Sequence, residues 1–413
     1  THFHGSSRHA LVVRLDAHER RRIHRLFLFG SLLQRAEAGE VSISRLDDAV
    51  RRILRVKLRA RLFEAGPPST RPLAGAYDEL GKPEHRAIAR QAVRQSLVLL
   101  KNNDQVLPLS PKSTIVVAGD GADSIGKQSG GWSLSWQGTG NTNSDFPHGT
   151  SVFEGIRRQV QAAGGRAILA TNDEWGEEPD AAVVVFGEDP YAEFQGDVSS
   201  LAYKPGDDTD YKQLKRFYDA GIPTVAVFLS GRPLWVNREI NVCNAFVAAW
   251  LPGSEGIGIA DVLLRSAEGD VQYDFRGKLP YSWPRTPVQT PLNVGDAEYD
   301  PLFPFGYGLT YADSINLPRL PEGFDGSQVA INLSRYFARG RAVAPWQIAL
   351  SSEGKESVVE TSRGVTDNGA LSIVSADESA QEDIRTITWS GEATSSFALT
   401  SSRPIDFSSP TLA

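Results

Sequence analysis

Two glutamates and a tyrosine lie close together in the run Gly187–Asp197, GEDPYAEFQGD, directly after an apolar segment. That segment, Ala181–Gly187, predicts a strand buried in a parallel sheet, because such strands read as short continuous apolar runs. Ligands of open α/β sheets bind beyond the carboxyl ends of these strands. Glu188, Tyr191 and Glu193 are therefore candidates for an acid/base site, in which desolvation would raise the pKa of one glutamate. The alternative is two solvated charges in a surface loop.

A second stretch that points to chemistry is the glycine-flanked loop Gly130–Gly138, GGWSLSWQG. Trp132 and Trp136 in this loop would be costly to expose unless a ligand stacks on them. Sugar rings present apolar C–H faces that suit an indole. The alternative is that both tryptophans are buried and anchor the loop.

A third loop, Ala118–Gly126 (AGDGADSIG), follows the first strand of the series and superficially resembles a phosphate-binding glycine loop. It lacks the GxGxxG spacing and the lysine of a P-loop, and Asp120 and Asp123 would repel phosphate. Nucleotide binding is therefore not expected here.

Cysteine and histidine give no sign of a metal or redox site. The only cysteine, Cys243, lies in an apolar run and is expected to be a buried, inert thiol. His2 and His4 lack the partners and the spacing of a metal site. No metal and no organic cofactor is expected.

The composition is that of a globular protein, with 40% hydrophobic and 23% charged residues among 413. A net charge of −7 argues against general nucleic-acid binding. No apolar run reaches the roughly 18 residues that span a bilayer. The absence of methionine and a start at Thr1 suggest a fragment of a longer protein.

The middle of the chain alternates between strand-like and helix-like segments, which predicts a mostly parallel sheet with helices on both faces. The expected helices are Ser151–Ala163, Asp210–Ala220 and Gly256–Leu264. The expected strands are Thr114–Gly119, Arg166–Ala170, Ala181–Gly187, Thr224–Ser230, Ala245–Leu251 and Lys278–Trp283.

The N-terminal flank of this series is helical. Ser44 and Asp47 fit a capping box, and the helix that follows has one apolar stripe that needs a partner: Leu46, Val50, Ile53, Leu54 and Leu58. A Pro- and Gly-rich linker, Glu64–Gly81, and a second helix, Pro83–Asn102, come next.

The C-terminal flank is β-rich. The runs after Thr310 are short, contain no convincing helix and predict a partial β-sandwich. Trp346 and Trp389 are expected in its core rather than as sugar platforms. The strand runs are Gln328–Leu333, Trp346–Leu350, Ser357–Thr361, Leu371–Val374, Ile384–Trp389 and Ser396–Leu399.

From about Gly30 to Tyr311 the chain resembles the exo-acting β-glucosidases and β-glucan glucohydrolases of glycoside hydrolase family 3. The motifs that carry this resemblance occur in the family's order. They are RLDDAVRRILRVK (Arg45–Lys57), QSLVLLKNNDQVLPL (Gln95–Leu109), GGWSLSWQG, GEDPYAEFQGD, LSGRPLWV (Leu229–Val236), AAWLPGSEG (Ala248–Gly256) and FPFGYGLTY (Phe303–Tyr311).

The resemblance implies a fold and a division of the chain into four segments. Residues 1–63 would be the remnant of the end of a (β/α)8 barrel, and residues 64–111 a linker and helix. Residues 112–312 would form a three-layer α/β/α sandwich, and residues 313–413 a truncated, jelly-roll-like β-sandwich.

The resemblance also implies residue roles. Glu193 matches the acid/base glutamate, and Glu188 is the lesser candidate for that role. Trp132, Trp136 and Tyr191 are the expected substrate contacts. The aspartate nucleophile, usually in an SDW-type motif of the barrel, has no match in this chain, and residues 1–29 do not match the usual barrel end.

The chain is thus interpreted as a fragment of a retaining exo-β-glucosidase that acts on β-glucan or β-glucoside and needs the missing N-terminal barrel as intramolecular partner. The resemblance favours a periplasmic or secreted full-length protein over a cytoplasmic one. The alternative is a non-catalytic carbohydrate-binding or regulatory module, and a nucleotide-binding α/β protein is a distant third.

Overall fold

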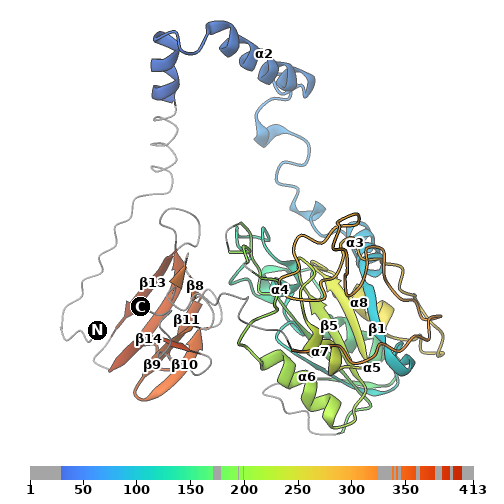
Figure 1. Cartoon of the computed structure of the whole chain (residues 1–413). Helices are drawn as coiled ribbons and strands as arrows, with labels where there is room; N and C mark the ends of the chain where they lie inside the picture. The colour runs from blue at the N-terminus through green and yellow to red at the C-terminus, as the bar shows by residue number, and fades with distance from the viewer. Residues whose placement is uncertain are drawn as a thin grey trace. The chain divides into compact units, whose positions relative to one another are not determined.

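The computed structural model describes residues 29–170, 178–193, 195–198, 200–323, 337–338, 341–342, 346–359, 363–376, 384–390 and 394–401. The chain divides into two compact units, residues 1–82 and residues 83–413 (Figure 1). His2 and His4 lie outside the described residues.

The first unit contains the helix α2, Ile43–Arg59, and two short 3₁₀ turns, Pro68–Thr70 and Tyr77–Glu79. The expected cap is wrong, because the helix begins at Ile43 and the Ser42 hydroxyl accepts from the backbone N–H of Arg45 at 3.3 Å. None of its side chains is buried. The apolar stripe is therefore present and uncovered.

The second unit is built on a six-stranded sheet in the order β1-β6-β5-β4-β2-β3. Five strands run parallel, and β1 pairs antiparallel with β6 at one edge. The predicted α/β class is confirmed. The strands are β1 Val98–Asn102, β2 Thr114–Ala118, β3 Arg166–Leu169, β4 Ala181–Gly187, β5 Thr224–Leu229 and β6 Ala245–Trp250.

Two expectations about this sheet are wrong. The helix α3 spans Pro83–Ser96, and Val98–Asn102, expected as its last turn, is the edge strand β1. All five residues of β1 are buried, so this apolar run fits a strand covered on both faces. Lys278–Trp283 is not a strand of the sheet, although Trp283 forms an isolated antiparallel bridge with Phe303.

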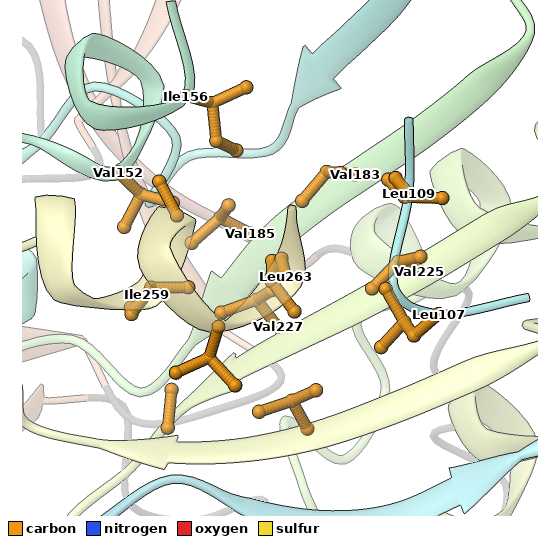
Figure 2. Close-up of a cluster of buried hydrophobic side chains, with 14 of the residues drawn as sticks. Leu107, Leu109, Val152, Ile156, Val183, Val185, Val225, Val227, Ile259 and Leu263 are labelled. Carbon is orange, nitrogen blue, oxygen red and sulfur yellow. The ribbon is translucent and has the colours of Figure 1, made fainter. Parts of the chain in front are cut away.

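Helices cover both faces of the sheet, as predicted. Along β4, Val183 and Val185 belong to one apolar cluster, whereas Val184 and Phe186 belong to the other. The first cluster includes side chains of α3, α5 (Val152–Ala162) and α8 (Ile257–Leu263), and the second includes those of α6 (Thr209–Asp219) and α7 (Asn237–Asn241). Figure 2 shows the first cluster, with Val152 and Ile156 of α5 and Ile259 of α8 beside β4 and β5.

Ion pairs with two buried carboxylates, in α8 and just before it, connect α3 to the first apolar cluster's side of the sheet. Asp261, 1% exposed, accepts hydrogen bonds from Arg90, from Arg94 at 2.8 Å and from Gln159 at 2.7 Å. One turn earlier along α3, Arg86 contacts the buried carboxylate of Glu255 at 2.7 Å. Arginines at i, i+4 and i+8 lie on one face of a helix, so a single stripe of α3 makes these ion pairs.

Small antiparallel sheets follow, as predicted. One has the order β10-β9-β14 and the other β11-β12-β13, and a short pair, β7 (Phe337–Ala338) and β8 (Arg341–Ala342), accompanies them. Ile348 and Leu350 of β9 pack with Leu371 and Ile373 of β12. The strand bounds are β9 Trp346–Ser352, β10 Lys355–Val359, β11 Arg363–Val365, β12 Leu371–Ala376, β13 Ile384–Trp389 and β14 Ser395–Ser401.

One of the two tryptophans in this region is exposed. Trp389 is 65% exposed, so its placement in the sandwich core was wrong, whereas Trp346 is half-buried. The expected strand Gln328–Leu333 lies outside the described residues.

Candidate active site

The candidate site lies where the order of the sheet reverses. After β2 the chain forms β3 on one side, then returns to form β4 on the other side of β2. At such a reversal, the segments that follow the two neighbouring strands, here β2 and β4, run in opposite directions. Ligands of α/β proteins bind in the crevice between these segments. The segment after β2 leads through α4 (Ile125–Ser129) into the tryptophan loop, Gly130–Gly138, and the segment after β4 carries Glu188, Tyr191 and Glu193.

Glu188 is held on both carboxylate oxygens. Arg232 donates to Oε1 from Nε at 3.0 Å and from a terminal nitrogen at 2.8 Å. The Gly231 backbone N–H and the Tyr191 hydroxyl donate to Oε2 at 3.2 and 3.1 Å. The side chain of Glu188 is 14% exposed, and its ion-pair partner Arg232 comes from the segment after β5 (Thr224–Leu229).

Tyr191 packs beneath the same arginine. The Arg232 guanidinium lies 4.5 Å from the centroid of its ring and also donates to the Gly196 carbonyl at 2.6 Å. A Cβ atom at Gly196 would lie 2.3 Å from the ring, so only glycine fits there. Burial, followed by the charge of Glu188, raises the pKa of Tyr191 to about 12. Its hydroxyl therefore remains a hydrogen-bond donor at neutral pH.

The tryptophan loop presents an exposed apolar surface. Trp132 and Leu134 are each 69% exposed and have positive φ angles, +60° and +63°. Residues other than glycine hold such angles only where surrounding structure imposes them, and they cluster at ligand sites. The rings of Trp132 and Trp136 lie 6.3 Å apart and are tilted by 50°. These rings offer the type of surface on which a sugar stacks.

Glu193 lies at the edge of this aromatic surface. Its side chain is exposed, and the indole Nε1–H of Trp136 donates to its Oε2. That hydrogen bond is the main reason why the pKa of Glu193 is lowered, because it favours the charged form. In this structure Glu193 is ionised at neutral pH.

Gln137, which the sequence reasoning gave no role, joins the two loops. This side chain is 1% exposed; its Oε1 accepts from the Ala192 N–H at 2.8 Å and its Nε2 donates to the Glu193 carbonyl at 3.3 Å. A buried amide that bonds both an N–H and a C=O of another segment fixes that segment's position. The only signal in the sequence was its place inside GGWSLSWQG.

Neighbouring carboxylates at this edge are bound to lysines. Lys127, 6% exposed, contacts Asp120 at 2.5 Å and Asp189 at 3.1 Å. Lys204 contacts Asp210 at 2.9 Å. The loop after β2 is thus tied to the loop after β4 by charge as well as by Gln137, and Asp120 serves in an ion-pair network.

The arrangement can supply one acid/base carboxylate beside an apolar platform. Glycoside hydrolysis requires two carboxyl groups, and retaining enzymes hold them about 5–5.5 Å apart. Both oxygens of Glu188 are engaged in hydrogen bonds, mainly with residues that follow β5, whereas Glu193 faces solvent. In the described part of the chain, no group of three or more His, Cys, Asp or Glu residues is placed to bind a metal ion.

Comparison with known protein families identifies the origin of this architecture. The family model described as the glycosyl hydrolase family 3 C-terminal domain matches residues 97–311, more than half of the chain. The chain belongs to glycosyl hydrolase family 3. A second model, described as galactose-binding domain-like, matches residues 344–412.

Named relatives of this family 3 chain include two β-glucosidases. The lysosomal beta glucosidase of Dictyostelium discoideum is 34% identical over 68% of this chain and 36% of its own length. The periplasmic beta-glucosidase of Salmonella typhimurium is 31% identical over 67% of this chain and 41% of its own length. The chain therefore spans only about two fifths of these relatives.

Solved structures agree with this assignment. The exo-1,3/1,4-beta-glucanase of a Pseudoalteromonas species has 46% sequence identity and a TM-score of 0.69, over 89% of this chain and 45% of that chain. A mutant of the same enzyme has 52% identity and a TM-score of 0.70, over 72% of this chain and 48% of that chain.

Within the described residues, every helix is too short or too polar to cross a lipid bilayer.

Proposed function

We propose that the complete protein is a retaining, exo-acting β-glucosidase or β-glucan glucohydrolase, and that Glu193 is its acid/base residue. The observation that carries this proposal is the hydrogen bond between the exposed Glu193 carboxylate and the Trp136 indole at the reversal point of the sheet. An acid/base beside an aromatic platform is what a glycosidase needs at the leaving-group sugar. Membership of family 3 and the names of the relatives support it.

In the proposed reaction, Glu193 first protonates the glycosidic oxygen as glucose leaves the non-reducing end of the glucan. It then removes a proton from the water that releases glucose from the enzyme. Trp132 and Trp136 would hold the leaving sugar. Tyr191 would contribute to the sugar-binding surface mainly by supporting the loop that carries Glu193. This chemistry requires no metal and no organic cofactor.

The lowered pKa of Glu193 does not by itself suit a general acid. A general acid must be protonated when the substrate binds, and a solvated carboxylate beside two indole donors is ionised. Covering this carboxylate with a sugar and a second domain would remove water and raise its pKa. We therefore assign the acid state of Glu193 to the assembled active site.

The second domain would be an N-terminal barrel that supplies the aspartate nucleophile. The exo-glucanase structure is more than twice as long as the part that this chain matches. The uncovered apolar stripe of α2, with Val50, Ile53 and Leu58 exposed, would pack against that barrel. Two relatives are named periplasmic, which supports export of the complete protein to the periplasm or beyond.

Comparing leaving groups in the complete protein tests the role of Glu193. An acid is essential for an alkyl β-glucoside but hardly needed for a dinitrophenyl β-glucoside, whose leaving group departs without a proton. Glu193→Ala should lose on the order of 10²–10⁴-fold in rate with the alkyl glucoside. It should form the glycosyl-enzyme readily from the activated one, and added azide should then accelerate turnover and yield a β-glucosyl azide.

Two matched variants complete the test. Glu298→Ala removes an exposed carboxylate remote in sequence and should retain wild-type rates. Glu188→Ala should lower activity and stability together without rescue by azide, because it releases Arg232. Unchanged hydrolysis in Glu193→Ala would refute the proposal. Glucan binding lost in Trp136→Ala alone would then favour the non-catalytic module.

A further inference from the structure

Three contacts join the tryptophan loop to the loop that carries Glu193. Gly131 lies against the Tyr191 carbonyl, the buried Gln137 bonds the backbone on both sides of the Ala192–Glu193 peptide, and the Trp136 indole donates to the Glu193 carboxylate. The first two contacts fix the backbones relative to each other. The third acts on the carboxylate itself.

We infer that Trp136 is a positioning residue for Glu193, holding its carboxylate through the indole Nε1–H in addition to offering a face to the leaving sugar. This inference rests on the proposed acid/base role of Glu193. It gives the indole two separable parts: a π face, which phenylalanine can replace, and an N–H donor, which phenylalanine lacks.

The surroundings of Glu193 make this donor the dominant local influence. The groups that lower the pKa of Glu193 are the Trp136 indole, then its own backbone N–H, with Trp132 contributing least, and slight desolvation opposes them. Among the described residues no charged side chain contributes to the shift. Two charged side chains nearby in sequence are paired with cations from other segments, Glu188 with Arg232 and Asp189 with Lys127.

A consequence follows for the reaction. The same ring that receives the leaving sugar also holds the proton donor, so the carboxylate is fixed relative to the glycosidic oxygen of a stacked sugar. The hydrogen bond also favours the ionised carboxylate, which is the form that accepts a proton from water in the second step. Trp136 would therefore limit the pH range over which Glu193 stays protonated.

Carboxyl resonances test the inference without any catalytic assay. The present chain, residues 1–413, is labelled with 13C at the glutamate side-chain carboxyl, and the Glu193 signal is assigned by its absence in Glu193→Gln. The titration of this signal should shift to higher pH in Trp136→Phe. Trp389→Phe, which alters an exposed indole of the C-terminal sheets, should leave it unchanged. An unshifted titration in a folded Trp136→Phe would overturn the inference.

A second measurement covers the case in which Trp136→Phe does not fold. At least one of the eight tryptophan indole N–H signals of the wild type should move with the titration of Glu193. That movement should vanish in Glu193→Gln, an exposed substitution that the fold tolerates. If no indole N–H signal follows the Glu193 titration, the inference is wrong.

The complete protein links the inference to the reaction. The basic limb of the plot of kcat/KM against pH reports the pKa of the general acid in the free enzyme. Trp136→Phe should therefore move this limb to higher pH. Loss of a stacking surface alone would raise KM and leave the limb in place. If Glu193→Ala retains full activity while the carboxyl titration still shifts in Trp136→Phe, the hydrogen bond stands and the proposed catalytic role falls.

Discussion

Gly131 packs directly against the backbone of Tyr191, and a Cβ atom at position 131 would lie 1.9 Å from the Tyr191 carbonyl oxygen. Gly131 belongs to the loop that carries the two tryptophans, and Tyr191 to the loop that carries Glu193. The smallest side chain at this one position would separate the two halves of the candidate site.

Gly131→Ala should therefore separate these loops and destabilise the protein by about 2 kcal/mol, because overpacking against backbone has no flexible side chain to relieve it. The indole of Trp136 would move away from Glu193, and the pKa of that carboxyl would rise. Urea denaturation and the 13C carboxyl titration measure the two effects. Gly323→Ala, where the Cβ meets nothing within 4 Å, should change stability by less than about 0.5 kcal/mol. Equal behaviour of the two variants would contradict the close contact.

Asp261→Asn should loosen α3 from the rest of the α/β unit. In this variant Arg90 and Arg94 face an amide in place of a carboxylate that is 1% exposed. Breaking a buried ion pair lowers the free energy of unfolding by about 3 kcal/mol. The surface pair Lys215–Asp219 provides the control, since Asp219→Asn should cost less than about 1 kcal/mol. Urea denaturation compares both with the wild type, and equal losses would show that Asp261 is not an anchor.

Glu239 should give the stability a distinct pH dependence. Burial, helped by Asp210 and Asp208 and opposed by Arg238, raises the pKa of Glu239 from an ordinary 4.5 to about 7. Between these values the unfolded chain is ionised and the folded one is protonated, so stability falls as pH rises from about 4.5 to about 7 and is then level.

Glu239→Gln removes the ionisable group and with it this pH dependence of the stability. It should be more stable than the wild type by about 3 kcal/mol at pH 8 and nearly equal to it at pH 4, because each pKa unit corresponds to about 1.4 kcal/mol. Urea denaturation of both proteins at the two pH values measures the difference. A difference that does not depend on pH would show that Glu239 ionises normally in the folded state.

Residues 1–413 alone should show no hydrolysis of a chromogenic β-glucoside above background. Their candidate site offers one free acid/base carboxylate, and retaining chemistry needs two carboxyl groups close together. Turnover that Glu193→Gln abolishes would contradict this expectation and would require a nucleophile within these residues.

Much of the fold was predictable because it follows from local patterns. The parallel strands are apolar runs bounded by turn residues, and α5, α6 and α8 were expected within one residue or two of their observed ends. The edge strand β1 was not predictable, since Ser96–Asn102 continues the apolar pattern of α3 and a short apolar run fits either element. Tertiary pairing with β6 decides between them.

The candidate site was predictable in its residue types but not in its partners. Glu188 and Glu193 belong to the same loop, and their different contacts come from distant segments, Arg232 for Glu188 and the tryptophan loop for Glu193. Gln137 received no role because its partners, Ala192 and Glu193, lie more than 50 residues away. The division into four segments given above stays a prediction, as do the roles of the five site residues.

The two ends of the family 3 domain meet at the edge strand. Leu309 bridges Leu99 of β1, with its backbone N–H donating to the Leu99 carbonyl at 2.9 Å, while the match to the family spans residues 97–311. A module whose entry and exit are neighbours can be inserted into another chain with little distortion of the host. Different flanking modules can therefore be joined to this domain beside Leu99 and Leu309, in evolution or by design, without a change in the order of the sheet strands.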